Sequence, residues 1–236
     1  MPTKEDLILE KRRYGLVQEV TNNELKLLEK GMPVQKIIGY VDLANVSIDV
    51  SKNVLIPRYE TEELILLVLQ ENKDENLKIL DLCCGSGFIG IALKKHKQNW
   101  NVTMSDISLD AIEQSKINIF KNNVNINIIQ SDLFKNIKDK FDIIVCNPPY
   151  ISHNEELSSS VLNYEPHTAL FANDNGLWFY KEIIKNARNF LNDRGKIYFE
   201  INPLHMEWWK EMQKEYNIVI HKDISQKNRM VVFRYE

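Results

Sequence analysis

From residue 77 onward, short runs of apolar and β-branched residues alternate with segments of helical periodicity. Such alternation predicts βα units arranged around a mostly parallel sheet. The runs expected to form strands are LKILDL, NVTMSD, INIIQ, FDIIVC, GKIYFEI, YNIVIH and MVVFRY. The last two are joined by KDISQKNR without a helix, which predicts an antiparallel pair at one edge. The pattern therefore predicts an α/β fold with a seven-stranded sheet.

Helical patterns occupy the segments between these runs. The ranges expected to be helical are 88–97, 108–122, 176–192 and 204–215. Ser108 is a suitable N-cap, and Gly195 is a suitable break after the third of these helices. Residues 151–175 show no clear periodicity. A loop of that length in a compact domain is usually functional or mobile.

The first 58 residues have a different pattern. Residues 1–35 are charged and helix-prone, whereas residues 36–58 alternate like a β-hairpin. We therefore expect a short N-terminal helical segment over 1–35, a hairpin linker over 36–58 and the main domain over 59–236. The main domain begins with a helix over ETEELILLVLQEN.

Composition narrows the classes of function. The 236 residues carry a net charge of −3, and Lys and Arg are scattered, so no basic footprint for stable nucleic-acid binding is seen. The N-terminus is charged and no apolar run approaches membrane-span length, so a cytoplasmic protein without a membrane partner is expected. Cys83, Cys84 and Cys146 offer neither a disulfide framework nor C-x-x-C spacing, and no metal is expected.

The segment ILDLCCGSGFIG places a strand, a glycine turn and a helix start in succession. Gly85, Gly87 and Gly90 match the G-x-G-x-x-G pattern, which by itself fits several nucleotide cofactors. Asp106 ends the next strand, 19 residues after Gly87, where a carboxylate can accept hydrogen bonds from ribose hydroxyls. Together these features predict a nucleoside-bearing cofactor.

Asp81 favours one such cofactor. Its carboxylate beside the glycine loop would repel a pyrophosphate, but it can hold an ammonium or sulfonium cation. S-adenosylmethionine carries both cations and no phosphate, so it is the expected cofactor. The alternative interpretation of Asp81 is an N-cap or turn former.

The stretch CNPPY follows the buried run FDIIV. Asn147 and Pro148 each precede a proline, so both are held extended. The Asn147 side-chain oxygen and the Pro148 carbonyl can each accept one N–H of a planar NH₂ group, and Tyr150 can supply a flat face. Methyl transfer is an in-line displacement that depends on such alignment. This chemistry suits a glutamine amide and an adenine amine equally.

The chain resembles the protein glutamine-N5 methyltransferases that modify peptide chain release factors. The segments that carry the resemblance, in family order, are VQKIIGY, NVLIPRYETEEL, ILDLCCGSG, SDIS, SDLF, NPPYI, YEPHTALF and KDISQKNRMVVF. IPRYETEEL is the most specific of them. The resemblance implies a Rossmann-like class I methyltransferase that uses S-adenosylmethionine. It also implies that the methyl acceptor is the glutamine in the Gly-Gly-Gln motif of a class I release factor.

The resemblance also assigns roles to residues. It implies that Asn147, Pro148, Pro149 and Tyr150 receive the glutamine, with Asn147, Pro148 and Tyr150 as the catalytic set. The residues implied to contact the cofactor are Cys83, Cys84, Gly85, Ser86, Gly87, Asp106, Asp132, Leu133 and Asn147, to which Asp81 is added from its charge. Asp132 and Leu133 also fit a strand-end turn and a core position.

Three departures from the family pattern stand out. Cys83 replaces a usual glycine, which is tolerable only if that position does not require a positive φ. Tyr59 replaces a common proline, and only 33 residues precede VQKIIGY. Arg58 and Glu165 are expected to form a salt bridge or cap, or to support the site.

Other functions also fit the motifs. They are methylation of a nucleic-acid amine, methylation of a ribosomal-protein glutamine, and cofactor binding without catalysis. The intact NPPY argues against the last of these.

Overall fold

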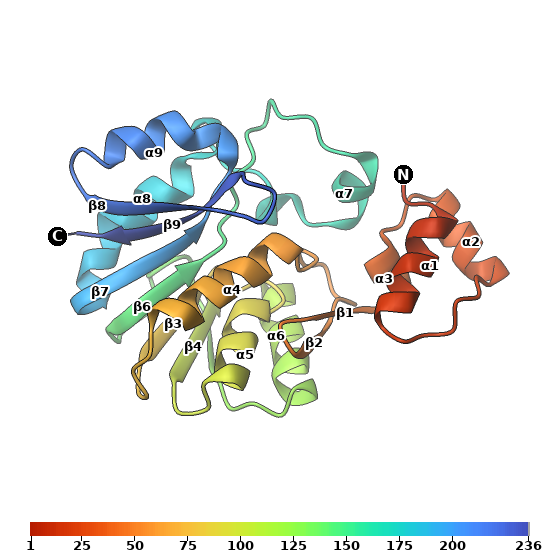
Figure 1. Ribbon diagram of the computed structural model, residues 1–236, viewed down its shortest axis with the longest axis horizontal. Helices are drawn as coiled ribbons and strands as arrows, with labels where there is room; N and C mark the ends of the chain where they lie inside the picture. Colours follow the sequence, from red (N-terminus) through yellow and green to blue (C-terminus); the bar gives the residue numbers. More distant parts are fainter. Residues whose placement is uncertain (236) are drawn as a thin grey trace.

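The computed structural model describes residues 1–235, which form a sheet domain and a smaller group of helices beside it (Figure 1). The N-terminal helices stand off one side of the sheet domain, and the hairpin joins the two parts (Figure 1). Within residues 1–235, no helix is long and apolar enough to cross a membrane.

The central sheet has seven strands in the order β5-β4-β3-β6-β7-β9-β8. The strands from β5 to β7 pair in parallel, whereas β9 is antiparallel to both β7 and β8. This confirms the predicted sheet and its antiparallel edge. The strand bounds are β3 Lys78–Leu82, β4 Asn101–Asp106, β5 Asn127–Gln130, β6 Phe141–Cys146, β7 Leu191–Glu200, β8 Asn217–Lys222 and β9 Asn228–Arg234.

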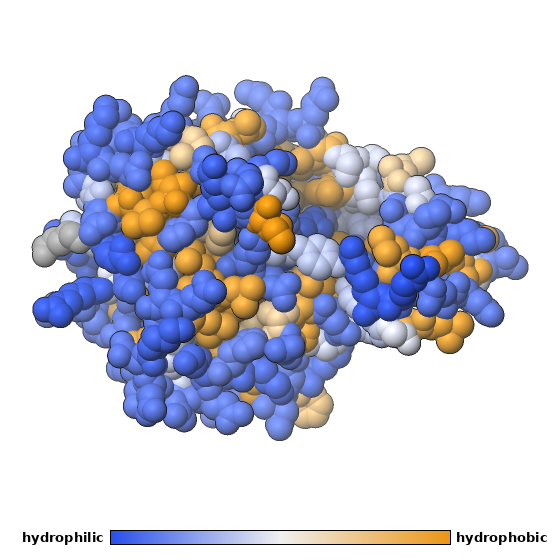
Figure 2. All heavy atoms as spheres, viewed as in Figure 1, coloured by the Kyte–Doolittle hydropathy of each residue, from blue (hydrophilic) through white to orange (hydrophobic). Residues whose placement is uncertain are grey.

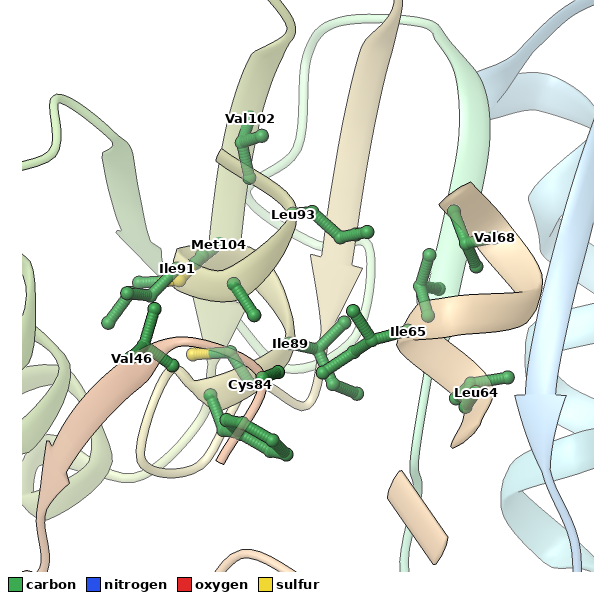
Figure 3. Close-up of a cluster of buried hydrophobic side chains, with 14 of the residues drawn as sticks. Val46, Leu64, Ile65, Val68, Cys84, Ile89, Ile91, Leu93, Val102 and Met104 are labelled. Carbon is green, nitrogen blue, oxygen red and sulfur yellow. The ribbon is translucent and has the colours of Figure 1, made fainter. Parts of the chain in front are cut away.

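Helices cover both faces of this sheet. On β3, Ile79 belongs to one buried cluster and Leu80 to the other, as the two-residue period of a strand requires. The first cluster packs under α4 (Tyr59–Glu71) and α5 (Phe88–His96), and α6 (Leu109–Lys121) lies beside α5. Figure 3 shows Ile65 of α4 and Ile89 of α5 pointing toward one another. The second cluster packs under α8 (Trp178–Ala187) and α9 (Met206–Met212).

The third predicted helix ends earlier than expected. α8 stops at Ala187, a 3₁₀ turn follows over Arg188–Phe190, and β7 already begins at Leu191. The prediction of a helix to residue 192 with a break at Gly195 was therefore wrong. Leu191 is buried and pairs with Phe141 of β6, so strand pairing and burial override the local helical pattern.

The segment after NPPY contains short helices rather than a bare loop. α7 spans Ser159–Tyr164, and 3₁₀ turns occupy His167–Ala169 and Asp174–Gly176. Ser158 caps α7 by accepting a hydrogen bond from the Val161 N–H. The lack of periodicity in the sequence thus reflects elements too short to show a period.

Three helices precede the hairpin: α1 (Lys4–Arg13), α2 (Asn22–Glu29) and α3 (Val34–Ile38). Thr3 and Thr21 start α1 and α2 with capping boxes. The helices share a small core of their own, formed by Leu7, Leu28 and Val34. The division of the chain at residues 35 and 58 stays a prediction, and α3 crosses the first boundary.

The hairpin, β1 (Tyr40–Leu43) and β2 (Val46–Asp49), is held on α6 by amide side chains. Gln114, Asn118 and Asn122 are spaced by four residues and so lie on one face of the helix. The Asn118 side chain accepts from the Asp49 N–H at 2.8 Å and donates to the Asp49 carbonyl at 3.0 Å. Asn122 bonds both backbone groups of Ser47 in β2, and Gln114 accepts from the Lys52 N–H just after the strand, so the edge of β2 is paired with side chains.

The face shown in Figure 2 is largely hydrophilic, with several groups of apolar side chains between the hydrophilic ones. Phe120, near the end of α6, is 90% exposed. Isolated exposed apolar residues are ordinary in folded proteins.

Replacing Asn118 with alanine should weaken the fold. The change leaves both backbone groups of Asp49 and the Ser86 carbonyl without their amide partner, so we expect a loss of about 2–4 kcal/mol in the free energy of unfolding. Urea denaturation measures this. Lys116→Ala, an exposed change on the same helix, is the control, and an equal loss in both variants would contradict the anchoring role.

Candidate active site

A cavity of about 310 Å³ opens at the carboxyl ends of the central strands. Going out from β3, the chain continues to β4 and β5 on one side and to β6 and β7 on the other. The cavity lies at this switch in strand order, which is the usual ligand position in open α/β sheets. Its volume suits a small-molecule cofactor. Its walls come from Thr61 and from residues within the segments 53–57, 82–89, 106–111, 131–133, 147–149, 166–169 and 178–179. The predicted site residues in the lining are Cys83, Cys84, Gly85, Ser86, Asp106, Asp132, Leu133, Asn147 and Pro149, whereas the predicted Gly87 is not part of it.

The glycine loop lies between β3 and α5. Gly87 has a φ of +81° and caps α5, and a Cβ there would lie 2.9 Å from the Ser115 hydroxyl. A Cβ at Gly90 would lie 2.6 Å from Met104 of β4, so the third glycine allows α5 to approach the sheet closely. The pattern therefore shapes the turn, and the backbone of Gly85 is left facing the cavity.

Asp106 lies at the end of β4 and lines the cavity. Its two oxygens accept hydrogen bonds from the Gly85 N–H and the Ser108 N–H, each at 2.9 Å. Burial raises the pKa of this carboxyl, and the backbone N–H groups act in the opposite direction. A carboxylate has more acceptor positions than these two bonds use, so Asp106 can also accept from hydroxyl groups of a ligand.

Asp81 lies behind the glycine loop and is fully buried, outside the cavity lining. Its Oδ2 accepts a hydrogen bond from the Gly90 N–H at 2.8 Å, in the first turn of α5. Its Oδ1 has no hydrogen-bond partner among the described residues. Burial raises the pKa of the Asp81 carboxyl to about 7. Asp81 thus supports the first turn of α5 from within β3, whereas the N-cap of α5 is Gly87, so Asp81 is neither the N-cap nor a turn former. Its contact with the cofactor stays a prediction.

Two non-glycine residues in the cavity wall have left-handed backbone conformations. Cys83 has a φ of +61° and Leu133 a φ of +46°. The position of Cys83 therefore does need a positive φ, so the condition for tolerating cysteine there is not met. A side chain in this region costs on the order of 1–3 kcal/mol. The Ser131 hydroxyl donates to the Leu133 carbonyl at 2.7 Å and helps to hold the second of these turns.

The NPPY segment leaves the end of β6 beside the glycine loop. Asn147 and Pro149 line the cavity, whereas Pro148 and Tyr150 do not. The Asn147 Nδ2 donates to the Thr61 hydroxyl at 3.3 Å. The Tyr150 hydroxyl donates to Glu200 Oε1 at 3.0 Å, and burial raises the pKa of Tyr150.

The sequence prediction missed Thr61 and Glu200. Thr61 lies in α4 and lines the cavity, while Glu200 ends β7 and is 1% exposed. For Glu200, the available signal was an acidic residue directly after the apolar run IYF, because a buried position is rarely charged without a partner.

The Arg58 guanidinium and the buried Glu165 carboxylate form the salt bridge that was one of the predicted alternatives. Glu165 also accepts from the Ile56 N–H at 3.0 Å. It therefore ties the segment before α4 to the end of α7.

Comparison with known proteins places this site in a family. The methyltransferase small domain family matches residues 60–164. A release factor glutamine methyltransferase of Lactococcus lactis subsp. lactis is 42% identical over 91% of this chain and 84% of its own length. The chain belongs to the release factor glutamine methyltransferase family. A second member, from Streptococcus pneumoniae, is 41% identical over 93% of the chain and 84% of its own length.

Solved structures confirm the Rossmann-like class I fold of this methyltransferase. A methyltransferase from Pyrococcus furiosus superimposes with a TM-score of 0.62 at 16% identity, covering 91% of this chain and 99% of that one. A 16S rRNA methyltransferase from T. thermophilus, in complex with AdoMet and guanosine, has a TM-score of 0.59 at 15% identity, covering 84% and 50%. These likenesses concern the fold alone.

The raised pKa of Asp81 makes the stability of the methyltransferase depend on pH. The folded carboxyl keeps its proton up to about pH 7, whereas the unfolded one loses it near the ordinary value of 3.8. Stability should therefore fall as pH rises between these values, by roughly 4 kcal/mol for the full shift. Asp81→Asn does not titrate, so its stability relative to wild type should rise over this range.

Urea denaturation of both proteins from pH 4 to pH 8, without cofactor, checks this. The exposed Asp139→Asn is the matched control. A stability difference between Asp81→Asn and wild type that stays constant with pH would contradict the prediction.

Proposed function

We propose that the enzyme transfers a methyl group from S-adenosylmethionine to the side-chain amide nitrogen (N5) of the glutamine in the Gly-Gly-Gln motif of a class I peptide chain release factor. The supporting observation is the position of Asn147: it lies in the cavity wall next to the glycine loop, with its Nδ2 bound to Thr61. The Asn147 Oδ1 is then available to accept a hydrogen bond from an N–H of the methyl acceptor. The family names support the release factor as the partner, and hence a cytoplasmic site of action.

The cavity residues fit S-adenosylmethionine. Asp106 has acceptor positions left for the ribose hydroxyls, and Ile107 at the same end of the cavity is 60% exposed, an apolar face that an adenine ring would cover. Leu133 and Asp132 lie in the cavity wall. Asp81 lies outside the lining, but its Oδ1 has no hydrogen-bond partner among residues 1–235, and we assign it to a cation of the cofactor on the basis of its charge. The bound cofactor supplies an electrophilic methyl group on its sulfonium.

The protein's part in the reaction is alignment. An amide nitrogen is a poor nucleophile because its lone pair is delocalised, so it must be held with that lone pair on the methyl group. Asn147 Oδ1 and the Pro148 carbonyl each accept one N–H of the glutamine amide, which also favours the positive charge that the nitrogen gains in the transition state. Pro149 and Tyr150 complete the receiving segment. The proton leaves after methyl transfer, so no general base is needed beforehand.

A labelling experiment tests the substrate. Radiolabelled S-adenosylmethionine is supplied with a class I release factor, with its Gln→Ala loop variant, and with DNA or ribosomal RNA. We expect label only on the release factor that retains the glutamine. Label on nucleic acid, or label that persists on the Gln→Ala protein, would refute the proposal in favour of an alternative acceptor.

Asn147→Ala should abolish turnover. The variant loses an acceptor that acts in the transition state, for which losses on the order of 10²–10³ in rate are typical. Cofactor binding, measured by calorimetry, should survive with reduced affinity. Asn101→Ala, an exposed change at the opposite end of β4, is the control. Near-normal turnover of Asn147→Ala would remove this residue from the mechanism.

A further inference from the structure

Three residues far apart in sequence form one hydrogen-bond relay behind the NPPY segment. The Asn147 Nδ2 donates to the Thr61 Oγ1 at 3.3 Å, and the Thr61 hydroxyl donates to Glu200 Oε2 at 2.7 Å. The residues come from the end of β6, from α4 and from the end of β7. Thr61 is 4% exposed and Glu200 is 1% exposed, so water does not compete for the bond between them. Asn147 is half-buried, and its bond to Thr61 lies at the cavity wall.

The relay has only one consistent direction. Burial raises the pKa of the Glu200 carboxyl, whereas the hydrogen bonds from Thr61 and Tyr150 favour its ionised form. The ionised carboxylate can only accept hydrogen bonds, so Thr61 must use its single hydroxyl proton on Glu200. The Thr61 oxygen can then only accept, and its partner must be a donor. Of the two ends of the Asn147 amide, the NH₂ group is the donor. The amide therefore turns its NH₂ toward Thr61 and its oxygen away from it.

We propose that Glu200, acting through Thr61, fixes the rotation of the Asn147 amide so that its oxygen faces the methyl acceptor. This inference rests on the proposed function. A flipped amide would present N–H donors to the N–H donors of the substrate amide and could not align it. Thr61 and Glu200 are therefore positioning residues, and they select for a substrate nitrogen that still carries hydrogen.

The Glu200 carboxylate also holds the other end of the NPPY segment. Glu200 Oε1 accepts the hydroxyl proton of Tyr150 at 3.0 Å, while Oε2 serves Thr61. One buried carboxylate thus fixes both Asn147 and Tyr150, three residues apart in the chain. An apolar side chain of similar size could fill this volume, but it could not impose a direction on the relay.

Replacement of Thr61 tests the relay. Thr61→Val keeps the shape but removes the hydroxyl, and we expect the single-turnover rate on the release factor to fall roughly tenfold, the size of one orienting hydrogen bond. Thr61→Ser keeps the hydroxyl and should stay within about threefold of wild type. The affinity for S-adenosylmethionine and the melting temperature are measured for both variants, and the rate is taken at saturating cofactor and substrate on folded protein. A Thr61→Val rate within twofold of wild type, or an equal loss in Thr61→Ser, overturns the inference.

A second background separates positioning from simple packing. In Asn147→Ala, residue 147 has no side-chain amide to orient, so the relay has no function left. Thr61→Val should then change the residual single-turnover rate of Asn147→Ala by less than about twofold. A loss as large as in the wild-type background would mean that Thr61 acts by packing alone and would overturn the inference.

The wild-type enzyme in the same assay distinguishes failure of the proposed function from failure of the positioning role. If wild type leaves the glutamine unlabelled, the proposed function fails and the positioning role fails with it. If wild type labels the glutamine and the Thr61 variants label it at the wild-type rate, only the positioning role fails.

Discussion

The parallel pairing of β3 with β6 is the constraint from which the site follows. Leu82 lies opposite Cys146 in this register, so the two strands end at the same level of the sheet. The glycine loop and the NPPY segment therefore emerge next to one another although about sixty residues separate them in the chain. Donor and acceptor sites for a group transfer are brought together by strand pairing before any ligand takes part.

Much of the sheet was predictable because its central strands are buried on both faces. The runs NVTMSD and FDIIVC coincide with β4 and β6 at both ends, and in each strand at least four successive residues are buried without alternation. The end of α8 was not predictable, because the pairing of Leu191 with Phe141 decides it from 50 residues away. The short helices after residue 151 have too few turns for a period to show.

In the candidate site, too, some residues were predictable from local sequence and others were not. Asp106 and Asn147 were found because Asp106 ends a recognisable buried strand and Asn147 directly follows another, and both line the same cavity. Thr61 and Glu200 were missed, since their meaning depends on a contact between α4 and β7 that no local pattern encodes. The left-handed backbone of Cys83 is likewise a property of the folded turn, and its residue type gave no sign of it.

The three amide side chains of Gln114, Asn118 and Asn122 have a consequence for ligand binding. Side-chain amides hold the backbone of the hairpin from Ser47 to Lys52, and the chain then runs directly into residues 53–57 of the cavity wall. These bonds are directional, so the hairpin cannot slide along the helix without breaking several of them together. The wall is thus already in place when a ligand arrives, and the loss of conformational entropy needed to order it is incurred once, during folding, rather than in every catalytic cycle.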